Sequence, residues 1–132
     1  PGIVICTCHS KTSTLDDGTT KFTPYIDGST KEDISKWFDF VFYTKTIVDS
    51  STRKRSYLWV TSRSEQYDHA KDRTGLLEEE IPQDFQLVIN AAVKRNFDGV
   101  KILVIGSPGS GKTRSLLTLN KENVNGTNND DK

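Results

Sequence analysis

A nearly continuous apolar run that leads straight into a glycine-rich turn constrains this 132-residue chain more than any other feature. The run is Val100–Ile105 (VKILVI), and such a run is typical of a strand that lies inside a sheet. The turn occupies 106–113 (GSPGSGKT), and Arg114–Asn120 behind it is helical in character. The sequence therefore predicts a strand, a tight turn and a helix in direct succession.

The turn matches the pattern G-x-x-x-x-G-K-[ST], which predicts a phosphate-binding loop. Its glycines permit the positive φ values that aim successive N–H groups inward, and the positive end of the following helix points to the same place. We expect Lys112 to reach the β- and γ-phosphates of ATP, and the Thr113 hydroxyl to bind Mg²⁺. The alternative is a glycine-rich turn without a ligand. The predicted nucleotide-binding residues are Gly106, Ser107, Pro108, Gly109, Ser110, Gly111, Lys112 and Thr113.

Hydrolysis of a nucleoside triphosphate also requires an acidic residue after a second apolar strand, where it holds Mg²⁺ and orients water. The chain contains no run of four apolar residues followed by Asp or Glu. Asp39, after Trp37 and Phe38, comes nearest, and we interpret it as structural. A nucleotide-binding module that cannot hydrolyse its ligand therefore stays open as an alternative to an ATPase.

Two further segments predict strands on either side of a turn. Asp39–Lys45 alternates and is rich in aromatic residues, and Tyr57–Thr61 is apolar. With a turn at Ser50–Arg55 between them, they predict an antiparallel hairpin. Ile3–Cys8 is β-branched and apolar, which predicts a buried strand, whereas the polar stretch His9–Lys31 is expected to be a long loop.

Helical spacing appears in one long segment and one short one. A helix beginning at Pro82 is predicted, because apolar residues recur at 85, 88, 89, 92 and 93. A short helix through Lys36–Phe38 is expected to be capped by Ser29 or Thr30. The aromatic residues beside it are expected in the core rather than on a stacking surface: Trp37, Phe38, Phe40 and Phe42.

Composition excludes some classes of function. Eighteen Lys and Arg balance eighteen Asp and Glu, so an overall basic field for nucleic acid or membrane is excluded, although a local patch is not. No apolar run is long enough to span a bilayer. Two cysteines, Cys6 and Cys8, favour a reducing, cytoplasmic setting, and we interpret them as buried thiols rather than as zinc ligands with His9 and His69.

These segments together resemble the RecA-like phage ATPases of the recombination and single-strand-annealing type. Gly99–Asn120 is similar to the beginning of such a protein. Ile3–Leu87 is similar to the end of one, through IVICTCHSK, ISKWFDFVFYTK and AKDRTG. The resemblance implies an α/β fold with a RecA-like core, a mostly parallel sheet and an antiparallel hairpin. Because the two parts stand in reversed order, it also implies an incomplete or circularly permuted version of that fold.

The resemblance also implies roles for particular residues. His9 would face the γ-phosphate, and the alternative is a histidine at the end of a strand that is bonded to the backbone. Lys71 and Arg73 would act on the nucleotide of a neighbouring subunit in a ring or filament, and the alternative is a solvated, charged turn. The polar loop that begins at His9 would contact single-stranded DNA, in the cytoplasm of a bacterial or phage-infected cell. Residues 1–120 would form the domain, from a C-terminal-half part (1–95) and a phosphate-loop part (96–120), followed by a disordered polar tail at 121–132.

Two basic segments are open to more than one interpretation. Arg53–Arg55 lies between two predicted strands, where it could contact a nucleic-acid backbone or simply keep a hairpin tip from aggregating. The loop at 9–31 combines Lys11, Lys21, Phe22 and Tyr25, which suits stacking on single strands, although Asp16 and Asp17 oppose it.

Overall fold

The computed structural model describes residues 2–26 and 33–106, which form a mixed α/β structure. The loop residues Ser107–Thr113, the predicted helix at 114–120, the tail at 121–132, and Ser29 and Thr30 lie outside the described residues. The elements in chain order are β1 (Ile3–Cys8), β2 (Ser10–Thr14), β3 (Thr20–Pro24), the 3₁₀ helix η1 (Ile34–Trp37), β4 (Phe40–Val48), β5 (Arg55–Val60), β6 (Lys71–Asp72), β7 (Glu80–Pro82), α2 (Phe85–Lys94) and β8 (Val100–Ile105).

The strand before the glycine-rich turn lies inside the main sheet. The sheet has the order β1-β8-β4-β5-β7, with β6 paired to β4, and β8 is parallel to both of its neighbours. The pairings β4–β5, β4–β6 and β5–β7 are antiparallel, so the prediction of a mostly parallel sheet is wrong for the described residues. The short turn at 49–54 makes β4 and β5 antiparallel, because parallel neighbours need long crossover connections.

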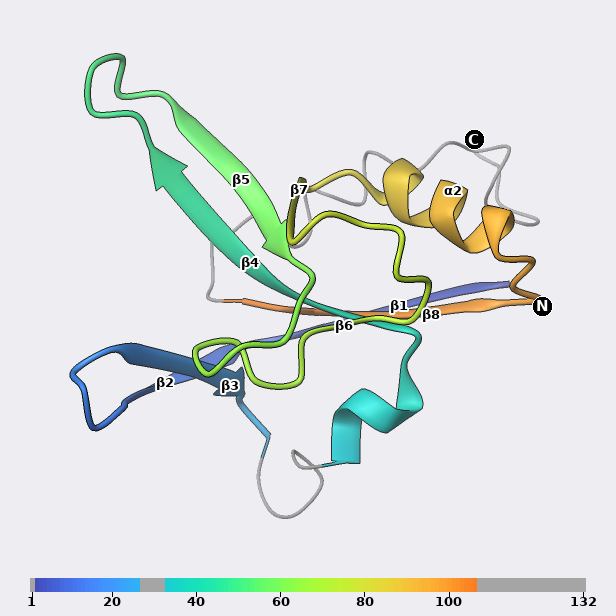
Figure 1. The fold of residues 1–132 in the computed structure, drawn as a ribbon, viewed down its shortest axis with the longest axis horizontal. Helices are drawn as coiled ribbons and strands as arrows, with labels where there is room; N and C mark the ends of the chain where they lie inside the picture. The colour runs from blue at the N-terminus through green and yellow to red at the C-terminus, as the bar shows by residue number, and fades with distance from the viewer. Residues whose placement is uncertain (1, 27–32, 107–132) are drawn as a thin grey trace, which may run out of the picture.

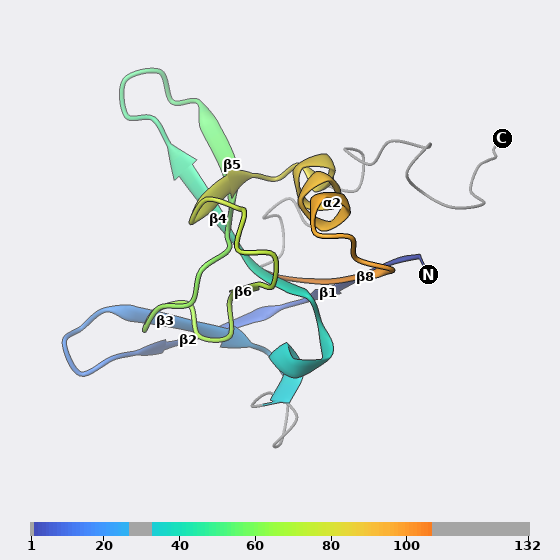
Figure 2. The same cartoon turned by 45° about the vertical axis from the view of Figure 1, so that its right-hand side comes forward.

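The two faces of the sheet are covered by different elements (Figures 1 and 2). Alternate residues of β4 and β8 point to opposite faces, so Phe40, Phe42 and Ile102 pack against α2. On the other face Val41, Tyr43, Leu103 and Ile105 pack toward η1 and the β2–β3 hairpin. This double coverage explains why β8 reads as a continuous apolar run.

The helix α2 begins later than the sequence predicted. Pro82 ends β7, and the helix starts at Phe85, where the carboxylate of Asp84 accepts a hydrogen bond from the Gln86 backbone N–H at 2.9 Å. An aspartate at this position satisfies one of the N–H groups that the first helical turn leaves unpaired. Asp84 therefore sets the start of α2, and Pro82 does not.

The predicted antiparallel hairpin is confirmed by β4 and β5, with Tyr43 opposite Val60 and Val48 opposite Arg55.

The prediction of a long loop at 9–31 is wrong for the described part of this segment, because β2 and β3 form a second, two-stranded sheet. Its turn is closed by Asp17, whose carboxylate accepts a hydrogen bond from the Thr19 N–H, and by Gly18 at φ +88°.

Two expectations about burial also fail. Ile3–Cys8 forms the predicted strand, but it is only partly buried, with Val4 49% exposed, because β8 is its only paired strand among the described residues. Phe40 and Phe42 are fully buried as expected, whereas Trp37 is 56% exposed at the end of η1.

No helix within the described ranges is long and apolar enough to cross a bilayer.

Candidate functional site

The first glycine of the motif lies where the carboxyl ends of β1 and β8 meet. Cys8 pairs with Ile105, and beyond this pair the Gly106 N–H donates to the Cys8 carbonyl at 2.9 Å. The Gly106 carbonyl in turn accepts from the Ser10 N–H at 3.2 Å, so these two bonds bracket His9. The structure thus brings together two predicted site residues that are 97 positions apart in the sequence, His9 and Gly106. In open α/β sheets, ligands bind outside the carboxyl ends of parallel strands, which is where these two residues lie.

His9 is exposed while its backbone is held in place. Its carbonyl accepts from the Tyr25 N–H at 2.7 Å, which ties the end of β1 to the end of the β2–β3 hairpin. The Cys8 thiol donates to the same carbonyl at 3.2 Å. An exposed imidazole on a fixed backbone can meet a ligand at this edge of the sheet without rearrangement of the strand.

A mostly apolar groove of about 560 Å³ begins at His9 and follows the η1 face of β1. Tyr25 and Ile26 line one part of it, and Trp37 and Phe38 line another. The volume falls within the range of small-molecule sites, and the lining suits a flat apolar group better than a charged one.

A buried hydroxyl lies on the same face of the sheet, one strand away from β8. The Tyr43 hydroxyl donates a hydrogen bond to the Asp68 carbonyl, and Tyr43 pairs with Ile105 through the backbone. Burial, and then the nearby Asp68 carboxylate, raise the pKa of Tyr43 far above its ordinary value. This tyrosine therefore stays protonated and structural at neutral pH.

The described residues do not supply a complete set of magnesium ligands. No group of three His, Cys, Asp or Glu side chains within 2–26 and 33–106 could hold a metal ion. Cys6 and Cys8 are free thiols, and both are only partly buried, so the expectation of buried thiols is wrong. Thr113, the predicted magnesium ligand, lies outside the described residues, as does Lys112.

Asp39 has a structural role at the opposite end of the sheet. One of its carboxylate oxygens accepts from the Arg73 guanidinium at 2.6 Å, and the other accepts from the Lys101 N–H at 3.0 Å. The carboxylate is only 14% exposed, and it joins β6 to the start of β8. Its interpretation as structural agrees with these contacts.

Lys71 and Arg73 lie at the amino end of the parallel strands, away from His9 and Gly106. The Lys71 ammonium donates to the carbonyls of Ser35 and Phe38 at 3.0 and 2.9 Å, and so holds η1 against β6. Arg73 pairs with Asp39 and lies 4.9 Å from the centre of the Phe97 ring. The action of Lys71 and Arg73 on a neighbouring subunit's nucleotide stays a prediction. Within one chain, both residues lie in a cleft that is separate from His9 and Gly106.

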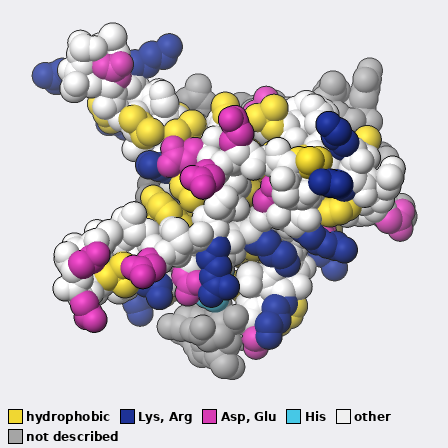
Figure 3. Space-filling view, in the orientation of Figure 1, with side chains coloured by type: hydrophobic (Ala, Val, Ile, Leu, Met, Phe, Trp, Pro, Cys, Tyr) yellow, Lys and Arg dark blue, Asp and Glu magenta, His cyan; other side chains and the backbone are white. Residues whose placement is uncertain are grey.

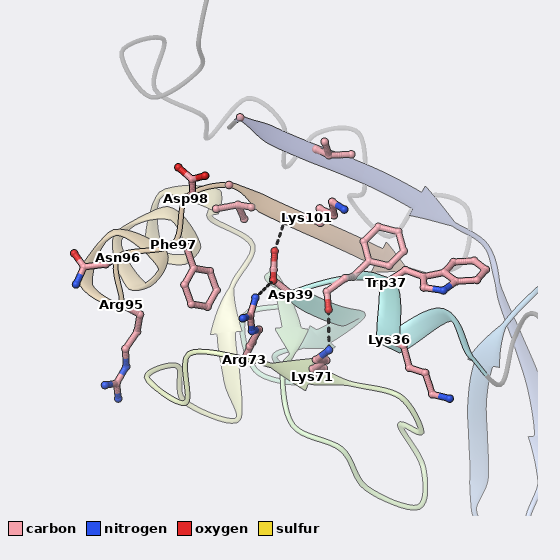
Figure 4. A pocket seen from close by; sticks show the side chains of 15 residues that line it. Lys36, Trp37, Asp39, Lys71, Arg73, Arg95, Asn96, Phe97, Asp98 and Lys101 are labelled. Carbon is pink, nitrogen blue, oxygen red and sulfur yellow. Dashed lines mark hydrogen bonds and ion pairs between the residues drawn. The ribbon is translucent and has the colours of Figure 1, made fainter.

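The cleft that contains Lys71 and Arg73 has a volume of about 790 Å³ and lies between η1, β6, the end of α2 and the start of β8 (Figure 4). The sequence did not single out its other cations, Lys36, Arg95 and Lys101, because they come from three separate elements. The sequence did contain one indication of this cleft: Lys101 is the one charged residue inside the apolar run of β8.

The remaining basic segments are placed as follows. Arg53 and Lys54 lie in the exposed turn of the β4–β5 hairpin, with Arg55 at the start of β5. Lys21 lies 3.7 Å from the Asp68 carboxylate, and the Phe22 ring stacks on Tyr67 with centroids 5.1 Å apart. One face of the Phe22 ring is therefore covered within the chain, and contact of this segment with single strands stays a prediction.

Comparison with known proteins identifies no relative: no family model, no curated protein and no solved structure matches the chain.

Proposed function

We propose that the chain binds a nucleoside triphosphate, ATP in the first instance, at the loop Gly106–Thr113, as part of a RecA-like phage ATPase that handles single-stranded DNA in recombination. In this proposal Lys112 contacts the β- and γ-phosphates and Thr113 binds Mg²⁺. His9 faces the γ-phosphate from the end of β1.

The observation that carries the proposal is the position of Gly106. The complete phosphate-loop pattern follows β8, a buried strand with a parallel neighbour on each side. The exposed side chain of His9 lies at the same edge of the sheet. A loop of this sequence needs such a strand before it, because the strand fixes the point from which the inward N–H groups are aimed.

The apolar groove beside His9 is the proposed location of the base. Phosphates require donors and cations, whereas a purine presents flat apolar faces with a few polar atoms at its edge. Tyr25, which is 62% exposed in the groove, offers an aromatic face for stacking. The triphosphate would then extend from the groove toward the loop.

A second candidate function is a module that binds the nucleotide without hydrolysing it. The strands beside β8 reach its carboxyl end with Cys8 and Tyr43, and neither position carries a carboxylate. Hydrolysis of this type requires such an acid for Mg²⁺. Phosphate release from ATP, with and without single-stranded DNA, separates the two functions: release supports the ATPase, and its absence in both conditions supports the passive module.

The binding itself is tested by titrating a fluorescent ATP analogue into the wild-type chain and into Lys112→Ala, with Mg²⁺ present. We expect the variant to bind about 10- to 100-fold more weakly, since a lost hydrogen bond from a cation to a phosphate corresponds to roughly 1.5–3 kcal/mol. Lys54→Ala, in the β4–β5 turn, is the matched control and should bind as the wild type does. Equal affinity of Lys112→Ala and wild type would remove the proposal.

A further inference from the structure

The cleft at the amino end of the parallel strands carries an excess of positive charge in a chain whose net charge is zero. Two acidic residues line it, Asp39 and Asp98, against five cations. The cations are Lys36, Lys71, Arg73, Arg95 and Lys101. Figure 3 shows Lys and Arg side chains gathered below α2. Cations gathered in a concave surface attract anions more strongly than the same charges spread over a flat one.

Several of these cations keep unused hydrogen-bonding capacity. Lys101 is exposed, and its ammonium has no partner among the described residues. Arg95 uses only Nε, which donates to the Thr74 carbonyl at 3.2 Å. Arg73 remains 61% exposed although it pairs with Asp39, so its guanidinium is open to a further acceptor.

The cleft also has an aromatic wall. Trp37 is 56% exposed and lies with Lys36 at one end of the cleft, while Arg95 lies at the other (Figure 4). Phe38 and Phe97 add two partly buried rings to the lining. Cations interleaved with an open aromatic face are the combination that binds single-stranded nucleic acids, where the cations follow the phosphates and the rings stack on bases.

We infer that this cleft binds single-stranded nucleic acid, with Lys101, Arg95 and Arg73 on the phosphates and Trp37 stacked on a base. An acidic protein segment would be attracted by the same charges, but it would leave the exposed indole without a flat partner. A volume of about 790 Å³ suits one or two nucleotides at a time, with the strand entering and leaving over the open rim. This assignment rests on the proposed function for the choice of nucleic acid. It gives that partner a location away from the phosphate loop, and the cleft adjoins the groove beside His9 at Trp37 and Phe38, which line both.

The test uses the full chain and a labelled oligo-dT of about 15 nucleotides, without ATP or Mg²⁺, so that it can fail independently of nucleotide binding. We expect binding at low salt that weakens as salt rises, because phosphate contacts release counterions. Lys101→Ala should weaken binding about three- to tenfold and reduce the salt slope by about 0.7, the share of one phosphate contact. Lys54→Ala should change neither quantity.

Tryptophan fluorescence gives an independent readout of stacking. The chain has two tryptophans, and Trp59 is fully buried against Phe42 and Phe85. Quenching by oligo-dT should therefore come from Trp37 and disappear in Trp37→Phe, while that variant keeps most of its affinity through the substituted ring. Trp37→Ala should lose affinity as well.

Three outcomes would overturn the inference. One is a loss of affinity for oligo-dT in Lys54→Ala as large as that in Lys101→Ala, which would place the binding site at the turn of the β4–β5 hairpin. Another is binding of poly-glutamate with the same affinity and the same quenching, which would indicate an acidic protein partner. The third is quenching that persists in Trp37→Phe. Heparin, a polyanion without bases, should compete with oligo-dT but leave the Trp37 emission unquenched.

Discussion

At the scale of single residues, Tyr43 shows how one buried polar atom can be tested. Its side chain is 1% exposed, and its hydroxyl donates to the Asp68 carbonyl. Tyr43→Phe removes the donor and leaves that carbonyl with less hydrogen bonding, so we expect the free energy of unfolding to fall by about 1 kcal/mol. Urea denaturation measures the change. Tyr25→Phe, at a side chain that is 62% exposed, is the control and should be neutral.

The raised pKa of Tyr43 adds a pH dependence whose sign is fixed. In the unfolded chain this tyrosine loses its proton near its ordinary pKa of 10.0, whereas in the folded chain burial keeps the proton on. The contribution of Tyr43 to the free energy of unfolding is therefore complete below pH 10. Above pH 10 this contribution declines by about 1.4 kcal/mol per pH unit. The stability difference between wild type and Tyr43→Phe should stay constant from pH 7 to 9 and shrink by pH 11. A constant difference up to pH 11 would mean that the folded protein also ionises Tyr43.

At the scale of elements, α2 offers a matched pair of valines. Val88 is fully buried against the sheet, and Val93 is 68% exposed on the same helix. Replacement of either by alanine gives a similar small gain in helix propensity, so the difference between them isolates burial. We expect Val88→Ala to lower the free energy of unfolding by about 2 to 3 kcal/mol, from two lost methyl groups and the cavity they leave. Val93→Ala should stay within about 0.5 kcal/mol of wild type. Similar losses in both would show that α2 does not cover the sheet in solution.

Elements with a strong apolar pattern are the ones that the sequence predicted well. Val100–Ile105 and the β4–β5 hairpin were predicted to within a few residues, because their burial leaves a local signature. The β2–β3 hairpin was missed because Ser and Thr fill its strands and only Phe22 marks a packed face, although Asp17 and Gly18 already signal a turn. Trp37 was wrongly assigned to the core, since composition cannot distinguish an aromatic residue at the rim of a sheet from one beneath it.

The candidate site was predictable only where it is local. The phosphate-loop pattern is contiguous and could be found without the structure. The proximity of His9 to Gly106 was expected from resemblance alone, since it depends on the parallel pairing of two strands that are far apart in the sequence. The basic cleft was not predicted, because its cations become neighbours only when η1, β6, α2 and β8 are assembled.

At the scale of the whole molecule, the two proposed sites lie at opposite ends of β8. Gly106 follows its carboxyl end, and Lys101 lies near its amino end. A six-residue parallel strand is about 17 Å long at a rise of roughly 3.3 Å per residue. A triphosphate held at one end therefore cannot occupy the cations at the other. Trp37 and Phe38 line both the cleft and the groove beside His9, so direct competition between ATP and single-stranded DNA should be confined to these two rings.

The relation between the two sites is tested by measuring the affinity for labelled oligo-dT with and without a saturating, non-hydrolysable ATP analogue and Mg²⁺. We expect the ATP analogue to lower the affinity by no more than Trp37→Ala does, because the rings of Trp37 and Phe38 are shared by the two sites whereas the cations of the cleft lie away from the phosphate loop. Inorganic triphosphate, which has no base, is the control for anions that enter the cleft directly, and any displacement by it should diminish in Lys101→Ala. Displacement of oligo-dT by the ATP analogue that persists unchanged in Lys112→Ala would show that the nucleotide itself binds in the cleft. In that event the phosphate-loop pattern would not be the nucleotide site, and the cations at the amino end of β8 would take its place.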